Sequence, residues 1–324
     1  MADRRDLRVV MLAGGVGGAR LAHGLQVHLG DRLTVVVNTA DDLERHGLLV
    51  CPDHDTVMYT LAGIDNRDWG WGIAGETFAA ADQMAGYGEE SWFRLGDRDL
   101  AAHIVRTNRL RGGMRLTEVL LGLQAALGIP ARILAMADEP VRTEVRTDDG
   151  WLDFQTYFVR LHQEPEVREL RYRGLDAAQI TPEVLDAFRS ADAIVIAPSN
   201  PFLSIAPILG VRGMREALDA ARTRGARIIA MSGIVGGKAI KGPADRILTS
   251  LGHEATAVGV AGQYRDLIDA FVIDTVDADL EPQIRALGPD VLVTDSIMSD
   301  DAARSRVASF VLDAIPPHRA GRHP

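Results

Sequence analysis

Residues 8–20 read Arg-Val-Val-Met-Leu-Ala-Gly-Gly-Val-Gly-Gly-Ala-Arg, a short apolar run that leads directly into a glycine-rich turn. The apolar run is typical of a buried strand, and the stretch after the turn, Leu21–Leu29, is typical of a helix. A strand, a tight turn and a helix in this order form the first unit of an α/β sheet. The N-terminal region therefore predicts an α/β fold.

The same turn suggests a phosphate site, because inward-facing N–H groups and a helix N-terminus attract anions. It nevertheless matches neither standard phosphate motif. A dinucleotide fingerprint that starts at Gly15 and Gly17 would need glycine where Arg20 stands, and the Gly-Lys-Ser/Thr of a P-loop is absent. The alternative is a tight turn without a ligand. Arg20 is expected to extend toward a ligand or to anchor the start of the helix.

The composition is that of an ordinary globular protein, with 47% hydrophobic and 25% charged residues among 324. A net charge of −10 argues against nucleic-acid binding. No apolar run approaches the ~20 residues that a membrane span needs, and the run that ends at Gly14 is too short for a signal peptide. A single cysteine, Cys51, excludes an internal disulfide. We therefore predict a cytoplasmic protein that binds neither nucleic acid nor membrane.

Short apolar runs that predict strands recur along the chain: Val9–Leu12, Leu33–Val37, Arg132–Ala135, Ala193–Ala197, Arg227–Met231, Ala257–Val260, Ala270–Ile273 and Val291–Val293. Stretches that predict helices separate many of them: Leu21–Leu29, Leu116–Leu127, Pro182–Ser190, Gly213–Thr223 and Ala302–Ala314. This alternation is typical of a doubly wound, mainly parallel, Rossmann-like sheet.

One region departs from this alternation. The runs Val141–Thr147 and Trp151–Phe158 flank Asp-Asp-Gly at 148–150, which predicts a β-hairpin. We interpret it as a small insertion or lid. The expected organisation is one α/β nucleotide-binding domain (1–138 and 175–315), the hairpin insertion (139–174) and a disordered tail (316–324).

Acidic pairs follow the second predicted strand. Asn38–Asp42 ends in two aspartates, and Asp53 and Asp55 come soon afterwards. Carboxylates beside a phosphate loop suggest Mg²⁺, a hard cation that prefers oxygen ligands and can bridge phosphates. Asp53 and Asp55 would face one site if their segment were extended. Alternatives are ribose binding by Asp41, which lies about twenty residues after the glycine turn, and helix capping.

Three further segments carry polar groups that could meet an anionic ligand. Arg98, Arg106 and Arg109 fall near one face of a predicted helix, although a solvated face is as good an explanation. Asp97 is interpreted as a cap of that helix and His103 as a structural residue. A loop with hydrogen-bonding side chains, Ser199 and Asn200 between two prolines, follows the most apolar strand.

The third segment is glycine-rich. Only two of the 35 basic residues are lysines, Lys238 and Lys241, and both lie in the loop 236–243. Where arginine is the default cation, this suggests that a compact point charge is needed. Two solvated loop lysines are the alternative. Together, the loops at the ligand edge of the sheet indicate a nucleotide-phosphate substrate.

These motifs, in this order, resemble the family of 2-phospho-L-lactate transferases that build the deazaflavin coenzyme F-420. The matching segments are Leu12–Arg20, Asn38–Asp42, 46–48, 52–61, 69–72, 95–106, 198–207 and 259–261. The resemblance implies a doubly wound α/β, Mg²⁺-dependent and dimeric transferase. It would move a phosphorylated three-carbon acid from a guanosine diphosphate carrier to the ribityl hydroxyl of 7,8-didemethyl-8-hydroxy-5-deazariboflavin and release GMP.

The resemblance also assigns residues. Deazaflavin contacts fall on Asp55, also the predicted catalytic residue, and on Arg98. Asp41 and Asp55 are the metal candidates, with Asp42 and Asp53 as alternatives. The candidates for contacts with the phosphates and guanosine are Gly15, Gly17, Gly18, Ser199 and Asn200, and Arg20 and Lys238 complete the predicted substrate contacts. A related family of nucleotide-sugar-binding regulatory proteins, without catalysis, shares the glycine turn and is the alternative. No motif indicates whether the acid is a lactyl, enolpyruvyl or glyceryl group.

Overall fold

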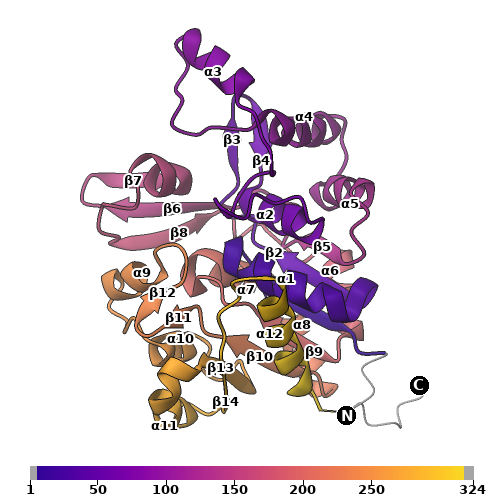
Figure 1. The fold of residues 1–324 in the computed structure, drawn as a ribbon, viewed down its shortest axis with the longest axis vertical. Coiled ribbons are helices and arrows are strands. Elements are labelled where there is room, and N and C mark those ends of the chain that lie inside the picture. The colour runs from indigo at the N-terminus through magenta and orange to yellow at the C-terminus, as the bar shows by residue number, and fades with distance from the viewer. Residues whose placement is uncertain (1–5, 317–324) are drawn as a thin grey trace.

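The fold is built around a twisted parallel sheet, seen in a computed structural model that describes residues 6–316 (Figure 1). Within that range the central sheet has seven strands, in the spatial order β14 (Asp290–Thr294), β13 (Ala270–Asp274), β10 (Arg227–Met231), β9 (Ala193–Ile196), β1 (Val9–Ala13), β2 (Leu33–Val37) and β5 (Arg132–Ala135). Every neighbouring pair is parallel. The predicted α/β fold with a mainly parallel sheet is confirmed.

The chain order of the strands reverses between β1 and β9. From β1 the chain adds β2 and β5 on one side, then returns to add β9, β10, β13 and β14 on the other. In such sheets a crevice opens at the carboxyl ends of the two strands that flank the reversal. The turn after β1 and the loop after β9 are therefore expected to border a ligand site.

Helices cover both faces of the sheet because its strands are apolar on both sides. Val9, Met11 and Ala13 pack into one buried cluster, whereas Val10 and Leu12 pack into another. The first cluster holds α1 (Gly15–Leu29), α2 (Pro52–Leu61) and α12 (Asp301–Asp313). The second holds α6 (Pro182–Ser190), α7 (Ala206–Gly210), α8 (Met214–Thr223), α9 (Ala244–Ser250), α10 (Ala257–Gln263) and α11 (Glu281–Arg285). In Figure 1, α1 and α12 lie side by side on their face of the sheet.

Smaller elements lie outside the central sheet. They are β3 (Leu43–Arg45) with β4 (Leu48–Val50), β6 (Arg142–Thr147) with β7 (Gly150–Asp153) and β8 (Glu169–Arg173), β11 (Ile234–Val235) with β12 (Lys238–Ala239), and the helices α3 (Ala79–Gly86), α4 (Asp97–Arg111) and α5 (Leu116–Ala126). At the top of Figure 1, α3 projects away from the sheet. The region around α3 and the β6–β8 sheet both extend beyond the carboxyl edge of the central strands.

The predicted hairpin is confirmed, but its second strand is shorter than expected. β7 ends at Asp153, whose carboxylate accepts hydrogen bonds from the backbone and hydroxyl of Thr156 and starts a helical turn, 156–160. β8 pairs with β6 and completes a three-stranded antiparallel sheet. Whether residues 139–174 act as a lid stays a prediction, and the expected tail lies outside the described residues except for Pro316.

One strand prediction was wrong, and one conditional expectation was not met. Ala257–Val260 starts helix α10 instead of forming a strand, because the Thr256 hydroxyl caps the Gly259 amide and four apolar residues cannot by themselves distinguish a strand from a helix. The segment that holds Asp53 and Asp55 is the first turn of α2, not an extended strand. Proline at the first helical position favours this start.

None of the helices between residues 6 and 316 is long and apolar enough to cross a membrane.

Candidate active site

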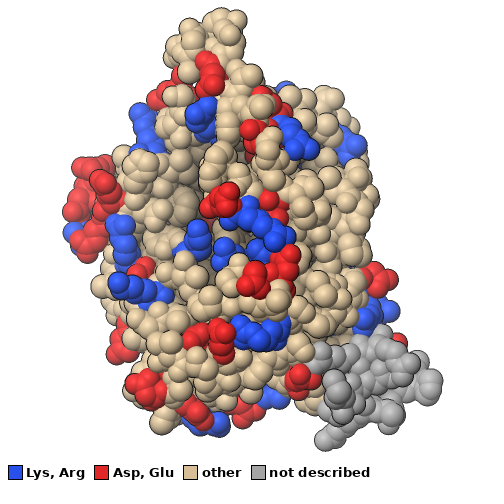
Figure 2. Space-filling view, viewed as in Figure 1, with Lys and Arg blue, Asp and Glu red and all other residues tan. Residues whose placement is uncertain are grey.

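A cavity of about 590 Å³ lies at the carboxyl edge of the central sheet. Its lining comes from the turn after β1, the first turn of α2, the loop after β9 and the loop 232–243. On the face drawn in Figure 2, Lys and Arg side chains gather near the centre with acidic side chains beside them. Although the chain has a net charge of −10, three basic side chains, Arg20, Arg94 and Lys241, line the cavity and could contact an anionic ligand.

The glycines of the first turn allow two loops to meet closely. A Cβ atom on Gly17 would lie 2.6 Å from the carbonyl oxygen of Pro198, and one on Gly18 would lie 2.9 Å from the Cβ of Ala13. Gly15 has φ of +61°, a conformation that L side chains rarely adopt. The glycines therefore serve loop packing, and Gly18 does not line the cavity.

Asn38 joins two carboxylates beside this turn. Its Nδ2 donates to Oδ2 of Asp41 at 3.1 Å and to Oδ2 of Asp53 at 3.0 Å. Burial raises the pKa of Asp53 to about 6, and burial together with the charge of Asp53 raises the pKa of Asp41 well above its usual value. Oδ1 of Asp41 is buried and has no hydrogen-bond partner within residues 6–316. This atom is free to bind a cation.

Asp53 also lies against the glycine turn, since a Cβ on Gly14 would be only 2.6 Å from its Oδ2 atom. A phosphate bound at the N-terminus of α1 would therefore lie near a carboxylate. Mutual repulsion would oppose this arrangement unless a divalent cation lay between the two. The oxygen donors of Asp41 and Asp53 fit Mg²⁺ for this reason.

The hairpin insertion reaches the same place. Nε2 of Gln155 donates to the carbonyl oxygen of Asp41 at 2.9 Å, and Gln155 lines the cavity. Because this contact joins residues 114 positions apart in the chain, the insertion helps to hold the Asp41 backbone.

A second polar group surrounds Asp55. Its Oδ1 accepts a hydrogen bond from Nη2 of Arg106, while its Oδ2 lies 3.7 Å from Nδ1 of His103. Nε2 of His103 lies 3.3 Å from Oδ1 of Asp99, which also accepts a hydrogen bond from the Tyr59 hydroxyl at 2.6 Å. All five side chains are buried, and all except Arg106 line the cavity.

Asp55, Asp99 and His103 could also hold a metal, since one ligand atom from each lies within 4.8 Å of the others. The Arg106 guanidinium already neutralises Asp55 and contacts His103, so a second cation there would meet like charge. Asp41 and Asp53 have no such partner within the described range, and they suit Mg²⁺ better.

The structure brings most of the predicted site residues together. Those that line the cavity are Gly15, Gly17, Arg20, Asp41, Asp53, Asp55, Ser199 and Asn200. Gly18, Arg98 and Lys238 do not line it, whereas Lys241 does. Asp42 is buried beside a smaller cavity behind the loop after β2, and burial raises its pKa to about 7.

The α4 arginines do not share a face. Arg106 is fully buried, whereas Arg98 and Arg109 are exposed. Arg98 donates from Nη1 to the carbonyl oxygen of Ala74 at 3.0 Å. Asp97 caps α3 rather than α4, because its carboxylate accepts hydrogen bonds from the amides of Ala79 and Ala80.

Sequence reasoning missed the aromatic side chains around the cavity. They are Trp69, Trp71, Trp92, Phe93, Phe154 and Phe158. Trp69 and Trp71 are about half exposed, with ring centroids 5.3 Å apart, and Phe154 and Phe158 are 5.2 Å apart. Three of the four tryptophans in the chain are among them, and this concentration was the available signal. Aromatic rings beside a polar cavity suit a planar ligand.

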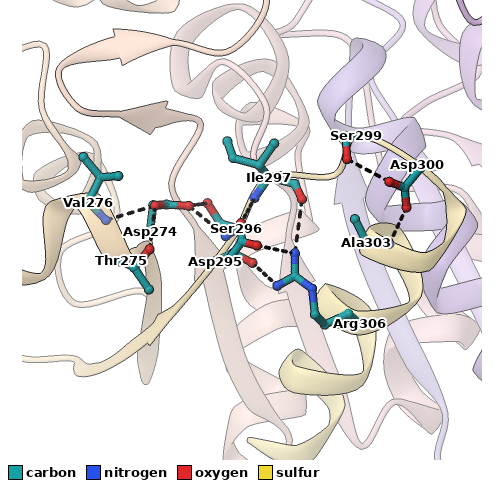
Figure 3. Close-up of polar contacts among 10 residues, drawn as sticks. All are labelled: Asp274, Thr275, Val276, Asp295, Ser296, Ile297, Ser299, Asp300, Ala303 and Arg306. Carbon is teal, nitrogen blue, oxygen red and sulfur yellow. Dashed lines mark hydrogen bonds and ion pairs between the residues drawn. The ribbon is translucent and has the colours of Figure 1, made fainter.

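Figure 3 shows polar contacts of the loop between β14 and α12. Ser296 and Met298 of this loop line the cavity. Oδ2 of Asp274 accepts hydrogen bonds from the Ser296 amide at 2.8 Å and from its hydroxyl at 2.7 Å. Although burial opposes it, hydrogen bonds from Val276 and Ser296 hold the pKa of Asp274 below its usual value. Arg306 of α12 pairs with Asp295 and fixes the other side of the loop.

Comparison with known proteins finds relatives that match nearly the whole chain. A family model described as 2-phospho-L-lactate transferase CofD matches residues 9–301. The phosphoenolpyruvate transferase of Kitasatospora aureofaciens is 42% identical over 314 residues, covering 94% of this chain and 97% of that protein. The 2-phospho-L-lactate transferase of Methanosarcina mazei is 39% identical over 308 residues, covering 94% of this chain and 100% of that protein.

Solved structures resemble the fold. Protein BH3568 from Bacillus halodurans has a TM-score of 0.64 at 17% sequence identity, covering 95% of this chain and 99% of that one. At this identity the similarity concerns the fold alone. The family model, which matches residues 9–301, and the relatives, which are 42% and 39% identical, show the family. The chain, a transferase by these relationships, belongs to the 2-phospho-L-lactate transferase CofD family.

Proposed function

We propose that this protein transfers a phosphorylated three-carbon acid from a guanosine diphosphate carrier to the ribityl hydroxyl of 7,8-didemethyl-8-hydroxy-5-deazariboflavin, with release of GMP, in coenzyme F-420 biosynthesis. The observation that carries the proposal is that the Asn38 side chain donates hydrogen bonds to both Asp41 and Asp53, beside the glycine turn and at a large cavity. This arrangement suits a diphosphate with its metal ion. A homodimer and a cytoplasmic location stay predictions.

The nucleotide donor is expected at the reversal of strand order. Asn200 supports this, because its Oδ1 atom accepts hydrogen bonds from the amides of Phe202 and Leu203. Its Nδ2 atom is buried and, among the described residues, has no partner. A buried donor without a partner costs free energy that a bound phosphate or base would recover. Arg20 and Lys241, which line the cavity, add positive charge.

The deazaflavin acceptor is expected between the aromatic side chains and Asp55. Trp69 and Trp71 offer flat surfaces at the solvent side, and Oδ2 of Asp55 is buried without a hydrogen-bond partner in the described range. A direct contact from Arg98 stays a prediction. Its main-chain amide and guanidinium bond to Glu76 and Ala74, so Arg98 supports the segment that carries the tryptophans.

The chemistry follows from this placement. The ribityl oxygen attacks the phosphorus that carries the three-carbon acid, the bond from that phosphorus to the GMP oxygen breaks, and the hydroxyl proton passes to a carboxylate. Oδ2 of Asp55 is the proposed acceptor of that proton. Asp41 and Asp53 would hold Mg²⁺, which when bound would neutralise charge on the phosphates.

Incubation with the deazaflavin and each of the lactyl, enolpyruvyl and glyceryl guanosine diphosphates tests the proposal. We expect GMP release only when both substrates and Mg²⁺ are present, and the product mass identifies the acid. Loss of GMP release in excess chelator and its recovery on adding Mg²⁺ would support the metal. Ligand binding without GMP release from any of the three donors would favour the regulatory alternative.

Thermal unfolding separates the proposed nucleotide from a dinucleotide. GDP at a hundred times its dissociation constant should stabilise the protein by ~2.7 kcal/mol, whereas NAD and NADP should leave the melting temperature unchanged. Arg20 occupies the position of the third glycine that a dinucleotide enzyme uses to bring its helix close to the strand. Stabilisation by NAD alone would contradict the proposed donor.

A further inference from the structure

A buried arginine lies behind the cavity wall. Arg106 of α4 has no exposed surface and does not line the cavity, whereas its partner Asp55 of α2 does. Nη2 of Arg106 donates to Oδ1 of Asp55, a contact between residues 51 positions apart. Arg106 therefore touches the proposed site only through other side chains.

The guanidinium is fixed by two further contacts. Nη1 of Arg106 donates to the carbonyl oxygen of Leu49 in β4 at 3.1 Å and to Nδ1 of His103 at 3.1 Å. The carbonyl contact anchors the planar group to the main chain of a different element. Because a guanidinium has a rigid donor geometry, the direction of each of its bonds is set by the others.

These contacts also orient the neighbouring cavity residues. A nitrogen that accepts from Arg106 carries no proton, so the proton of the His103 ring is on Nε2. That atom faces Oδ1 of Asp99 at 3.3 Å, and the Tyr59 hydroxyl donates to the same oxygen. One side chain that is remote from the ligand thus sets the direction of Asp55 and the tautomer of His103.

Arg106 keeps its positive charge although it is buried. Burial by itself would lower the pKa of Arg106, but the charge of Asp55 outweighs it and holds this pKa above its usual value. With Oδ1 of Asp55 bound to the arginine, Oδ2 has no hydrogen-bond partner in the described part of the chain. Arg106 therefore determines that Oδ2, and not Oδ1, is the oxygen of Asp55 that can accept a hydrogen bond from a ligand.

We propose that Arg106 is a positioning residue of the transfer reaction, which acts by aiming the free Oδ2 atom of Asp55 at the acceptor hydroxyl. This inference rests on the proposed function. Arg106 has two separable tasks, since a buried ion pair also stabilises the fold. The test must therefore measure a quantity, here kcat relative to KM, that a change in folding stability alone would not alter.

The variants Arg106→Lys, Asp55→Asn and the combination of both form a double-mutant cycle. Arg106→Lys keeps the positive charge but loses the planar guanidinium that makes several hydrogen bonds in fixed directions. We therefore expect kcat to fall by ~10- to 100-fold while KM for the nucleotide donor stays within about threefold. The double variant should be no slower than Asp55→Asn alone, because the arginine acts through that carboxylate. Arg109→Lys, an exposed change on the same helix, is the matched control and should keep the wild-type kcat.

The outcomes separate the inference from the function. No GMP release from the wild type would overturn the proposed function, and the inference with it. GMP release from the wild type with unchanged kcat in Arg106→Lys, or with additive losses in the double variant, would overturn the positioning role alone. If melting curves show that Arg106→Lys is unfolded, Arg106→Gln/Asp55→Asn replaces it, because this variant buries no unpaired charge. Its kcat should then equal that of Asp55→Asn, and a lower value would contradict the inference.

Discussion

The Oγ atom of Ser199 lies 3.1 Å from the backbone nitrogen of Gly14 and 2.6 Å from its carbonyl oxygen, so it accepts one hydrogen bond from this residue and donates another. The two residues are 185 positions apart. They follow β9 and β1, the strands at which the sheet order reverses. Ser199 therefore joins the two loops that border the proposed donor site.

Ser199→Ala should weaken this junction. Both hydrogen bonds are lost, so the free energy of unfolding should fall by about 1–3 kcal/mol and KM for the nucleotide donor should rise. Denaturant unfolding and initial-rate kinetics measure the two effects. Ser190→Ala, at the exposed end of α6, should change neither quantity. A raised KM with unchanged stability would instead indicate that the Ser199 hydroxyl contacts the ligand directly.

The two lysines of the glycine-rich loop should differ. Lys241→Met should raise KM for the donor by ~10-fold or more, because Lys241 lines the cavity and a hydrogen bond from a charged donor to a phosphate or carboxylate is worth about 1.5–3 kcal/mol. Lys238→Met should stay within about twofold, since Lys238 is exposed and does not line the cavity. A large rise in KM for Lys238→Met and none for Lys241→Met would instead support Lys238 as the substrate contact.

Magnesium binding should depend on pH. Protons compete with Mg²⁺ for Asp53, whose pKa is raised to about 6, and for Asp41, whose pKa is also raised. The dissociation constant for Mg²⁺ should therefore be at least ~10-fold larger at pH 5 than at pH 7.5. Titration calorimetry measures it.

Substitutions identify the ligands. Asp53→Asn should abolish most of the affinity for Mg²⁺, whereas Asp149→Asn, in an exposed turn, should not change it. If Asp55→Asn abolishes binding and Asp53→Asn does not, the metal lies instead at the group of Asp55, Asp99 and His103.

Asp42 should make the protein less stable as pH rises. Burial raises its pKa in the folded state to about 7, so the folded state holds a proton that the unfolded state has lost above about pH 4. Its contribution to stability is present at low pH and is lost as pH rises through 7. Asp42→Asn stays neutral, so its stability relative to the wild type should increase by about 2 kcal/mol between pH 5 and 8. Denaturant unfolding at both pH values measures this, and a constant difference would show that Asp42 is ionised throughout.

Local sequence patterns were sufficient for the core of the sheet. The run Leu33–Val37 became β2 with the same bounds, because four of its five residues are β-branched and all five are buried, as in a strand covered on both faces. Local patterns were not sufficient for Ala257–Val260, which starts a helix that the Thr256 side chain caps. Short apolar runs are ambiguous because their periodicity is too brief to read.

The sequence by itself predicted that the glycine turn, Asp41 and the serine-asparagine loop meet at one edge of the central sheet. Each follows a strand, and parallel strands bring their carboxyl ends to the same edge. Only the tertiary structure decided the partners: Asp41 with Asp53, and Asp55 with Arg106. These pairings depend on which face of α2 Asp53 and Asp55 occupy and on the packing of α4 beside β4. Such contacts join side chains far apart in the chain, and no local pattern in the sequence encodes them.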